Sequence, residues 1–375
     1  MLEKKLFITR PMTPKLPKFF SQVEDICKKK WLTNFGSYHE QLEHELTNLL
    51  DVNYLNLTNN GTSALLIALK ALNLPLGSEV ITSPFTFAAT CHSIVWNGLV
   101  PVFCDIEEEN FTIDPKKIEA LITPKTKAIL GVHVYGFACK IEEIAQIAQK
   151  YDLKVIYDAA HAFNTFYNGK GIGNYGDATV FSFHSTKLFN TVEGGAVSSS
   201  NPLFYEIVHK LSNFGISDEE HVDFIGLNAK MNEIQAAWGL SNLEIYSSEF
   251  KRREKIYDFY FSSLFGKKGI TIPRFKDKNT KSYQYFPILL DKVLEPNSRN
   301  KLYENFVKHN IYARKYFYPA CSDYPCYSNV RGRNNLLVTN DVKSRILCLP
   351  FYGDLSDDQL DEIVKIIINF VNGKN

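Results

Sequence analysis

Two titratable residues, Lys187 and Asp158, come directly after short β-branched and aromatic runs. Asp158 ends the run 153–158, and Lys187 follows the run 178–183. Such runs are typical of buried strands, and ligands of open α/β sheets bind at the carboxyl ends of the strands. The two side chains are therefore predicted to face one ligand. Together they could hold an aldehyde as an imine and keep a ring nitrogen protonated.

This pair of functions is the one that pyridoxal phosphate requires. A lysine amine binds its aldehyde, and a carboxylate keeps the pyridine nitrogen protonated so that the ring can accept electrons from a carbanion. A free lysine, with a pKa of about 10.4, is mostly protonated at neutral pH, so Lys187 must be desolvated or lie near positive charge to react. Taken singly, each residue has a simpler explanation, a solvated loop lysine and a helix-capping aspartate. The surrounding sequence favours the cofactor.

The segment 57–65 combines the end of a strand, a glycine turn and the start of a helix. Free N–H groups and the positive end of a helix dipole bind anions, so Gly61, Thr62 and Ser63 are candidate ligands of the cofactor phosphate. Ser182 is a second candidate donor if Lys187 is the anchor. The alternative is an ordinary turn in which Thr62 or Ser63 caps the helix.

Phe87, in the segment 84–90, is a candidate for an aromatic ring that stacks on the pyridine. The chain has 27 phenylalanines, most of which are expected in the core, so the residue type alone does not single out Phe87.

A rival signal comes from the glycines of 171–176, which match G-x-G-x-x-G, with Glu193 further along the chain. That dinucleotide fingerprint needs a strand before it and a helix after it. Here a polar turn precedes the glycines and the strand-like run 178–183 follows. The sequence therefore predicts a loop and disfavours a nicotinamide enzyme.

Composition excludes several classes of protein. The chain has 375 residues, 45% of them hydrophobic, and a net charge of +1, so neither a broad basic face for nucleic acid nor an acidic tail is expected. The sequence contains no run of about 18 apolar residues and its start lacks a secretory signal pattern, so a cytoplasmic protein without a membrane segment is predicted.

The cysteines are predicted to be reduced thiols. There are seven, an odd number, and none forms a Cys-x-x-Cys pair. Cys321, Cys326 and His133 could be imagined as metal ligands, but their spacing matches no zinc pattern. We predict no metal.

Strand-like and helix-like segments alternate from about residue 50 to 200, which favours an α/β fold with βα units around a mostly parallel sheet. A long helix is predicted over 230–262, followed by a smaller α+β part. We therefore predict a large domain over 1–240, with an N-terminal helical segment and helices flanking the sheet, and a small C-terminal domain over 241–375.

Several ordered blocks make the chain resemble the sugar-nucleotide aminotransferases of the DegT/StrS family, a branch of the fold-type I pyridoxal-phosphate enzymes. The resemblance runs almost end to end. The blocks that carry it are 60–65, 84–90, 158–162, 182–187, 193–196 and 226–237. One departure is Val192, where the family usually has glycine.

The resemblance implies a role for each candidate cofactor residue. Lys187 would form the imine with pyridoxal phosphate and move protons, Asp158 would pair with the pyridine nitrogen, and Phe87 would stack on the ring. His161 would lie near the phenolic oxygen. The phosphate contacts would be the backbone of Gly61, Thr62 and Ser63, the Ser182 side chain, and Asn228 of the partner subunit. A homodimer with shared active sites follows.

The resemblance also implies the reaction. Relatives that are dehydratases have histidine in place of the lysine, so Lys187 favours transamination, with L-glutamate as donor, pyridoxamine phosphate between the two halves, and a nucleotide-linked keto-sugar as acceptor. Segments 31–34, 310–319 and 322–325 look most like the subgroup acting on dTDP-4-keto-6-deoxyglucose. The product would be dTDP-4-amino-4,6-dideoxyglucose, an O-antigen precursor of lipopolysaccharide biosynthesis.

Two alternatives stay open at this point. One is amination at C3 of a dTDP-3-keto sugar, because those enzymes share much of the pattern and specificity depends on contacts that a motif does not show. The other is a catalytically silent regulatory relative on the same fold. Candidate contacts with the sugar or the nucleotide are Tyr135, His184, Arg314 and Tyr316.

Overall fold

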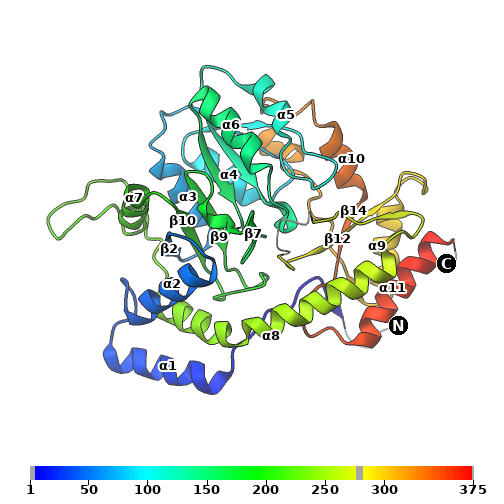
Figure 1. The fold of residues 1–375 in the computed structure, drawn as a ribbon, viewed down its shortest axis with the longest axis horizontal. Coiled ribbons are helices and arrows are strands. Elements are labelled where there is room, and N and C mark those ends of the chain that lie inside the picture. The colour runs from blue at the N-terminus through cyan, green and yellow to red at the C-terminus, as the bar shows by residue number, and fades with distance from the viewer. Residues whose placement is uncertain (1–4, 276–281, 374–375) are drawn as a thin grey trace.

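The computed structural model describes residues 5–275 and 282–373. A seven-stranded sheet in the order β2-β10-β9-β6-β5-β3-β4 forms the centre of its larger part (Figure 1). The strands are β2 (Tyr54–Thr58), β3 (Glu79–Thr82), β4 (Val100–Phe103), β5 (Thr126–Val132), β6 (Lys154–Asp158), β9 (Ala178–Ser182) and β10 (Gly195–Ser199). Only β10 runs antiparallel to its neighbours in this sheet. The predicted α/β fold with a mixed, mostly parallel sheet is confirmed.

Helices cover both faces of this sheet. Successive side chains of a strand point to opposite faces, and here apolar side chains on both faces need to be buried. Val80 packs in one core cluster and Ile81 in another, and the same alternation holds for Ile156 and Val155. One face is covered by α3 (Gly61–Ala71), α4 (Ala88–Trp96) and α7 (Pro202–Ser212), and the other by α2 (Ser37–Leu49) and α6 (Ile141–Tyr151). With both faces buried, polar ligands can reach the sheet only at the strand ends.

Helix α8 (Glu233–Leu264) is the helix predicted over 230–262, and it leads from the large sheet to the C-terminal part (Figure 1). The elements of that part are β11 (Ile270–Thr271), β12 (Phe286–Leu290), β14 (Ile346–Leu349), α9 (Ser298–Lys308), α10 (Leu337–Arg345) and α11 (Asp357–Val371). There a three-stranded antiparallel sheet packs with α8, α9 and α11 around a second core, while α10 contributes Val342 to a separate cluster.

The domain division at residue 240 stays a prediction. That position lies inside the continuous helix α8. In addition, β1 (Leu6–Phe7) pairs with β13 (Ile311–Tyr312), so the first described residues join the C-terminal part of the chain.

The glycines of 171–176 form no dinucleotide site. They lead through a three-residue 3₁₀ turn, Ile172–Asn174, directly into β9, and no helix follows. A Cβ atom at Gly171 would lie 2.0 Å from the Leu50 carbonyl oxygen, so this glycine permits close packing. The predicted loop is confirmed.

Within 5–275 and 282–373, no helix combines the length and the apolar character that crossing a bilayer requires. The same residues contain no group of three or more His, Cys, Asp or Glu side chains placed to hold a metal ion.

Glu233, at the start of α8, supplies the N-terminal cap of α2. The N-cap residue of α2 is Gly36, which has no side chain to accept the free N–H groups of the first turn. The buried Glu233 carboxylate accepts both the Tyr38 and the His39 N–H at 2.9 Å. One carboxylate therefore joins the starts of two helices.

We expect Glu233→Ala to lower the free energy of unfolding by roughly 2 kcal/mol, because two buried N–H groups lose a charged acceptor. Glu40→Ala, which removes an exposed carboxylate from the same first turn, is the matched control and should cost only a few tenths of a kcal/mol. Urea unfolding followed by circular dichroism measures both. Equal midpoints for the two variants would contradict the capping role.

Candidate active site

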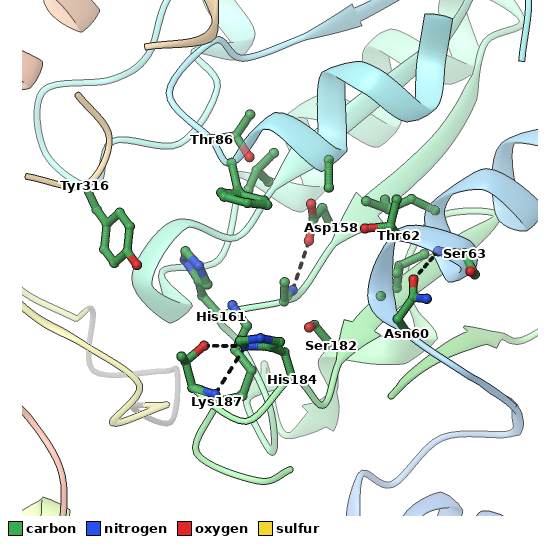
Figure 2. A pocket seen from close by; sticks show the side chains of 18 of the residues that line it. Asn60, Thr62, Ser63, Thr86, Asp158, His161, Ser182, His184, Lys187 and Tyr316 are labelled. Atoms are coloured by element: carbon green, nitrogen blue, oxygen red, sulfur yellow. Dashed lines mark hydrogen bonds between the residues drawn. The ribbon is translucent and has the colours of Figure 1, made fainter. Parts of the chain in front are cut away.

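Asp158 and Ser182 end neighbouring parallel strands, β6 and β9, and Lys187 follows Ser182 in the next loop. All three line one cavity of about 580 Å³ at the carboxyl edge of the sheet. Figure 2 shows Asp158 and Lys187 on opposite sides of this cavity, with Ser182 between them and the start of α3. The structure thus brings the two predicted reactive groups to one site.

The Asp158 carboxylate is 5% exposed and has two hydrogen-bond donors. Oδ2 accepts from Thr90 Oγ1 at 2.7 Å, and Oδ1 accepts from the Ala160 N–H at 3.0 Å. Burial raises the pKa of Asp158, while these two hydrogen bonds and the charge of Lys187 favour the anion. A buried carboxylate of this kind is stabilised by a cationic N–H, which is what a protonated pyridine nitrogen offers.

The Lys187 amine is prepared to act as a nucleophile. Burial lowers its pKa to about 8, although the Asp158 charge opposes that shift. At pH 7 roughly a tenth of the amine is then neutral, far more than for a free lysine. Nζ lies 6.0 Å from the centre of the Tyr285 ring, and it has no hydrogen bond or ion pair within the part of the chain that the structure describes. A carbonyl compound in the cavity could reach it.

The start of α3 forms an anion cradle. Its N-cap is Asn60, whose Oδ1 accepts the Ser63 N–H at 2.8 Å, so neither Thr62 nor Ser63 is the cap. Among the described residues, the N–H groups of Gly61 and Thr62 have no backbone or side-chain acceptor. Thr62, Ser63 and Ser182 all line the cavity, so these N–H groups and hydroxyls could bind a phosphate there.

Two glycines let this cradle lie against the sheet. A Cβ atom at Gly61 would be 2.9 Å from Ser182 Cβ, and one at Gly195 would be 2.8 Å from the Asn60 carbonyl carbon. Any side chain at either position would push the helix start away from β9 and β10. The close approach brings Ser182 into the cradle.

His161 is held as a neutral donor. Its Nδ1 accepts the Tyr135 N–H at 3.2 Å, which puts the ring proton on Nε2. Burial lowers the pKa of His161 far below its ordinary value. The ring is parallel to that of Phe317, with centroids 5.7 Å apart, and edge-on to Tyr285 at 4.8 Å. His161 therefore presents a fixed N–H group to the cavity.

Of the other predicted site residues, some line the cavity and some do not. Phe87 precedes α4, lines the cavity and leaves 62% of its surface exposed, so its ring is free to cover a ligand. His184 and Tyr316 also line the cavity. Tyr135 does not, because it is buried behind the wall and donates its hydroxyl to the Tyr316 carbonyl.

Arg314 and Asn228 lie outside the cavity. The Arg314 guanidinium is exposed and lies 5.0 Å from the centre of the Tyr316 ring, near the cavity rim. Asn228 lies beside the turn that precedes the cradle, where its carbonyl accepts from Asn59 Nδ2 at 3.3 Å.

Some cavity residues carried no sequence prediction as site residues. Among them are Thr86, Glu193, Tyr285 and Phe317. Glu193 Oε1 lies 3.5 Å from His184 Nε2. Its position before two glycines was the one sequence signal that could have marked it as a site residue. Tyr285 and Phe317 come from the C-terminal part and reach the cavity only through the packing of the two parts, which no local pattern reveals.

Comparisons with known proteins agree with this geometry. The model of the "DegT/DnrJ/EryC1/StrS aminotransferase family" matches residues 16–368. The chain is 43% identical to a "dTDP-4-amino-4,6-dideoxy-D-glucose transaminase" from Shigella dysenteriae, over 98% of this chain and 99% of the relative. It superposes on DesI, crystallised with its TDP-sugar product, with a TM-score of 0.92 and 29% identity. That match covers 100% of this chain and 95% of DesI. The chain also superposes on a sugar aminotransferase of Streptococcus pneumoniae described as putative, in its PMP form, with a TM-score of 0.91 and 25% identity. That match covers 99% of this chain and 98% of the other.

The lowered pKa of Lys187 leads to a test on the cofactor-free protein. Its reactivity toward acetic anhydride should rise with pH and reach half its maximum near pH 8, since only the neutral amine reacts. Asp158→Asn removes the charge that favours the ammonium form, so the half-point should move to lower pH. Peptide mass spectrometry measures the labelling, with the exposed Lys170 as internal reference. A half-point at the same pH as that of Lys170 would show that the cavity does not activate Lys187.

Proposed function

The chain belongs to the DegT/DnrJ/EryC1/StrS aminotransferase family of pyridoxal-phosphate-dependent enzymes and is a sugar-nucleotide aminotransferase, and we propose that it converts dTDP-4-keto-6-deoxyglucose to dTDP-4-amino-4,6-dideoxyglucose with L-glutamate as amino donor. The observation that carries the chemistry is the placement of Lys187 and Asp158 in one cavity beside an anion cradle. The choice of sugar is supported by the end-to-end similarity to the Shigella enzyme.

The residues of the cavity fit pyridoxal phosphate. The unpaired N–H groups at the start of α3 suit its phosphate, and the buried Asp158 carboxylate suits a protonated ring nitrogen. The exposed ring of Phe87 suits a stacked partner, and the Nε2–H of His161 suits the phenolic oxygen. When bound, the cofactor supplies an electron-accepting ring for the carbon that loses or gains a proton.

Lys187 has two tasks in this proposal. Its neutral amine would hold the cofactor aldehyde between turnovers, and the free amine would move a proton from one substrate carbon to another position during the reaction. A pKa near 8 suits both, since the amine must be able to accept and release a proton at neutral pH. Asp158 stays anionic throughout and keeps the ring nitrogen protonated.

The rim of the cavity is proposed to bind the sugar nucleotide. His184 and Tyr316 lie where polar atoms of the sugar would enter, and Thr186 orients His184 through a 2.8 Å hydrogen bond to Nδ1. The exposed Arg314 is suited to a diphosphate. Tyr135 would act indirectly, because its hydroxyl holds the backbone of Tyr316.

We also propose a homodimer whose active sites contain residues of both subunits. Asn228 lies outside the cavity of its own chain and follows a loop, residues 213–227, that projects at the left of Figure 1. This loop exposes Val222, Ile225 and Leu227. A largely apolar hollow lies elsewhere on the chain, lined by Phe19, Leu32, Val192, Asn232, Ile234, Gln235 and Trp238. A second copy could bury the apolar residues of both surfaces.

With pyridoxal phosphate, L-glutamate and dTDP-4-keto-6-deoxyglucose, the purified protein is expected to form the 4-amino sugar. Lys187→Ala should reduce the rate by roughly a thousandfold or more and abolish borohydride labelling, whereas Lys170→Ala should change neither. The products are separated by liquid chromatography and mass spectrometry. Faster turnover of a dTDP-3-keto sugar would move the reaction to C3. No near-visible absorbance band and no product from either sugar would favour the silent relative.

The dimer proposal is tested at Ile225, which is 84% exposed. Ile225→Asp should raise the dimer dissociation constant by roughly tenfold or more, because a charge would have to be desolvated in the interface. Leu337→Asp, at an exposed site in α10 on the other side of the molecule (Figure 1), should have no effect. Sedimentation velocity measures both. A wild-type protein that stays monomeric at micromolar concentration would refute the dimer.

A further inference from the structure

Lys230, which follows the projecting loop and precedes α8, is a largely buried cation. Only 8% of its surface is exposed. Its backbone forms an isolated bridge with Thr58, at the end of β2. Thr58 precedes the turn that leads into the anion cradle.

The ammonium group of Lys230 is surrounded by neutral partners. Nζ lies 2.6 Å from Asn213 Oδ1 and 3.1 Å from Asn228 Oδ1, and 5.1 Å from the centre of the Phe214 ring. In the part of the chain that the structure describes, no carboxylate oxygen lies within 4.0 Å of it. Burial accordingly lowers the pKa of Lys230. A cation removed from water without an anion is costly, so a counter-charge from outside the chain would stabilise it.

The contact with Lys230 fixes the orientation of the Asn228 amide. An ammonium group can only donate, so it must face the oxygen of that amide and not its nitrogen. Both N–H bonds of Asn228 Nδ2 then point away from Lys230. Within residues 5–275 and 282–373 they have no acceptor, and Asn228 is exposed. The chain presents an oriented pair of donors with a positive charge directly behind it.

We propose that Lys230 is a positioning residue for the phosphate site of the opposite subunit: it orients the Asn228 amide toward the cofactor phosphate and adds a positive charge behind that amide. This inference rests on the proposed dimer with shared sites. The phosphate dianion would be the counter-charge that Lys230 lacks among residues 5–275 and 282–373. The cradle at the start of α3 supplies N–H donors from one subunit, and the Asn228–Lys230 pair completes it from the other.

A purely structural role is the alternative, in which Lys230 only ties the loop to Asn213. That role predicts a loss of stability or of the dimer, with no effect specific to the phosphate. The two roles are separated by measuring pyridoxal-phosphate affinity on cofactor-free enzyme, the ³¹P chemical shift of the bound phosphate, and the sedimentation of each variant.

Lys230→Met keeps the length of the side chain and removes the charge and the donors. We expect it to weaken pyridoxal-phosphate binding by about tenfold or more and to shift the ³¹P resonance, while the protein remains dimeric. Lys230→Arg should restore most of the affinity. Lys210→Met, which removes a partly exposed lysine from the neighbouring helix α7, should behave like the wild type.

A double-mutant cycle tests whether Lys230 acts through Asn228. Asn228→Ala should weaken binding, and Lys230→Met should add little further loss in the Asn228→Ala background. Full additivity would overturn the proposal, as would unchanged affinity or an unchanged ³¹P shift in Lys230→Met. A loss of affinity that disappears at protein concentrations high enough to restore the dimer would also overturn it.

Mixed dimers test the assignment to the opposite subunit. In a dimer of Lys187→Ala and Lys230→Met chains, the one site that retains Lys187 receives its Lys230 from the other chain, so borohydride labelling should show wild-type affinity. In a dimer of wild-type and doubly substituted chains, the one labelled site faces the altered partner and should be weakened. The reverse order would overturn the proposal. Failure of the wild-type enzyme to be labelled at Lys187 would instead refute the proposed function.

Discussion

The site depends on one electrostatic arrangement, a buried carboxylate and a buried amine in one cavity at the ends of two adjacent parallel strands. Each group is destabilised in its charged form by burial, and each favours the charged form of the other. Hydrogen bonds from Thr90 and the Ala160 N–H favour the anion of Asp158, whereas the Lys187 amine has no hydrogen bond to any residue that the structure describes. Hydrogen bonding thus favours the charged form of the carboxylate but not that of the amine. This difference permits an amine that reacts and a carboxylate that only holds a proton on its partner.

The one antiparallel strand of the sheet, β10, brings the parts of the site together. Strand β10 inserts antiparallel between β2 and β9, so its first residue, Gly195, pairs with both Thr58 and Ser182. The cradle and the lysine loop are thereby brought together from segments that are far apart in the sequence. Because Gly195 and Gly61 have no side chains, the start of α3 packs directly on this strand edge. One ligand could then place its phosphate in the cradle and its carbonyl group at the Lys187 amine.

The sequence predicted the parts of the site that depend on local patterns. Asp158 and Lys187 follow strand signals, and Gly61 lies in a recognisable turn, so their placement at one sheet edge followed from the α/β alternation. Asn60 as the cap was missed because Thr62 and Ser63 are equally good capping residues in the same turn. The tautomer of His161 depends on the Tyr135 N–H, which a left-handed backbone conformation, with φ of 55°, aims at the ring. Such a conformation is rare for tyrosine, and no propensity predicts it.

Two electropositive features near the turn that follows β2 have no anionic partner among the residues that the structure describes. The cradle gives N–H donors that need an anion, and Lys230 is a buried cation that lacks one. If one phosphate served both groups within a single chain, Asn228 would have to line the cavity, and it does not. The proposed two-fold dimer would resolve this, since an isologous interface would bring each patch to its counterpart on the other copy. In that proposed dimer neither subunit would hold a complete phosphate site, so cofactor binding and subunit association would stabilise each other.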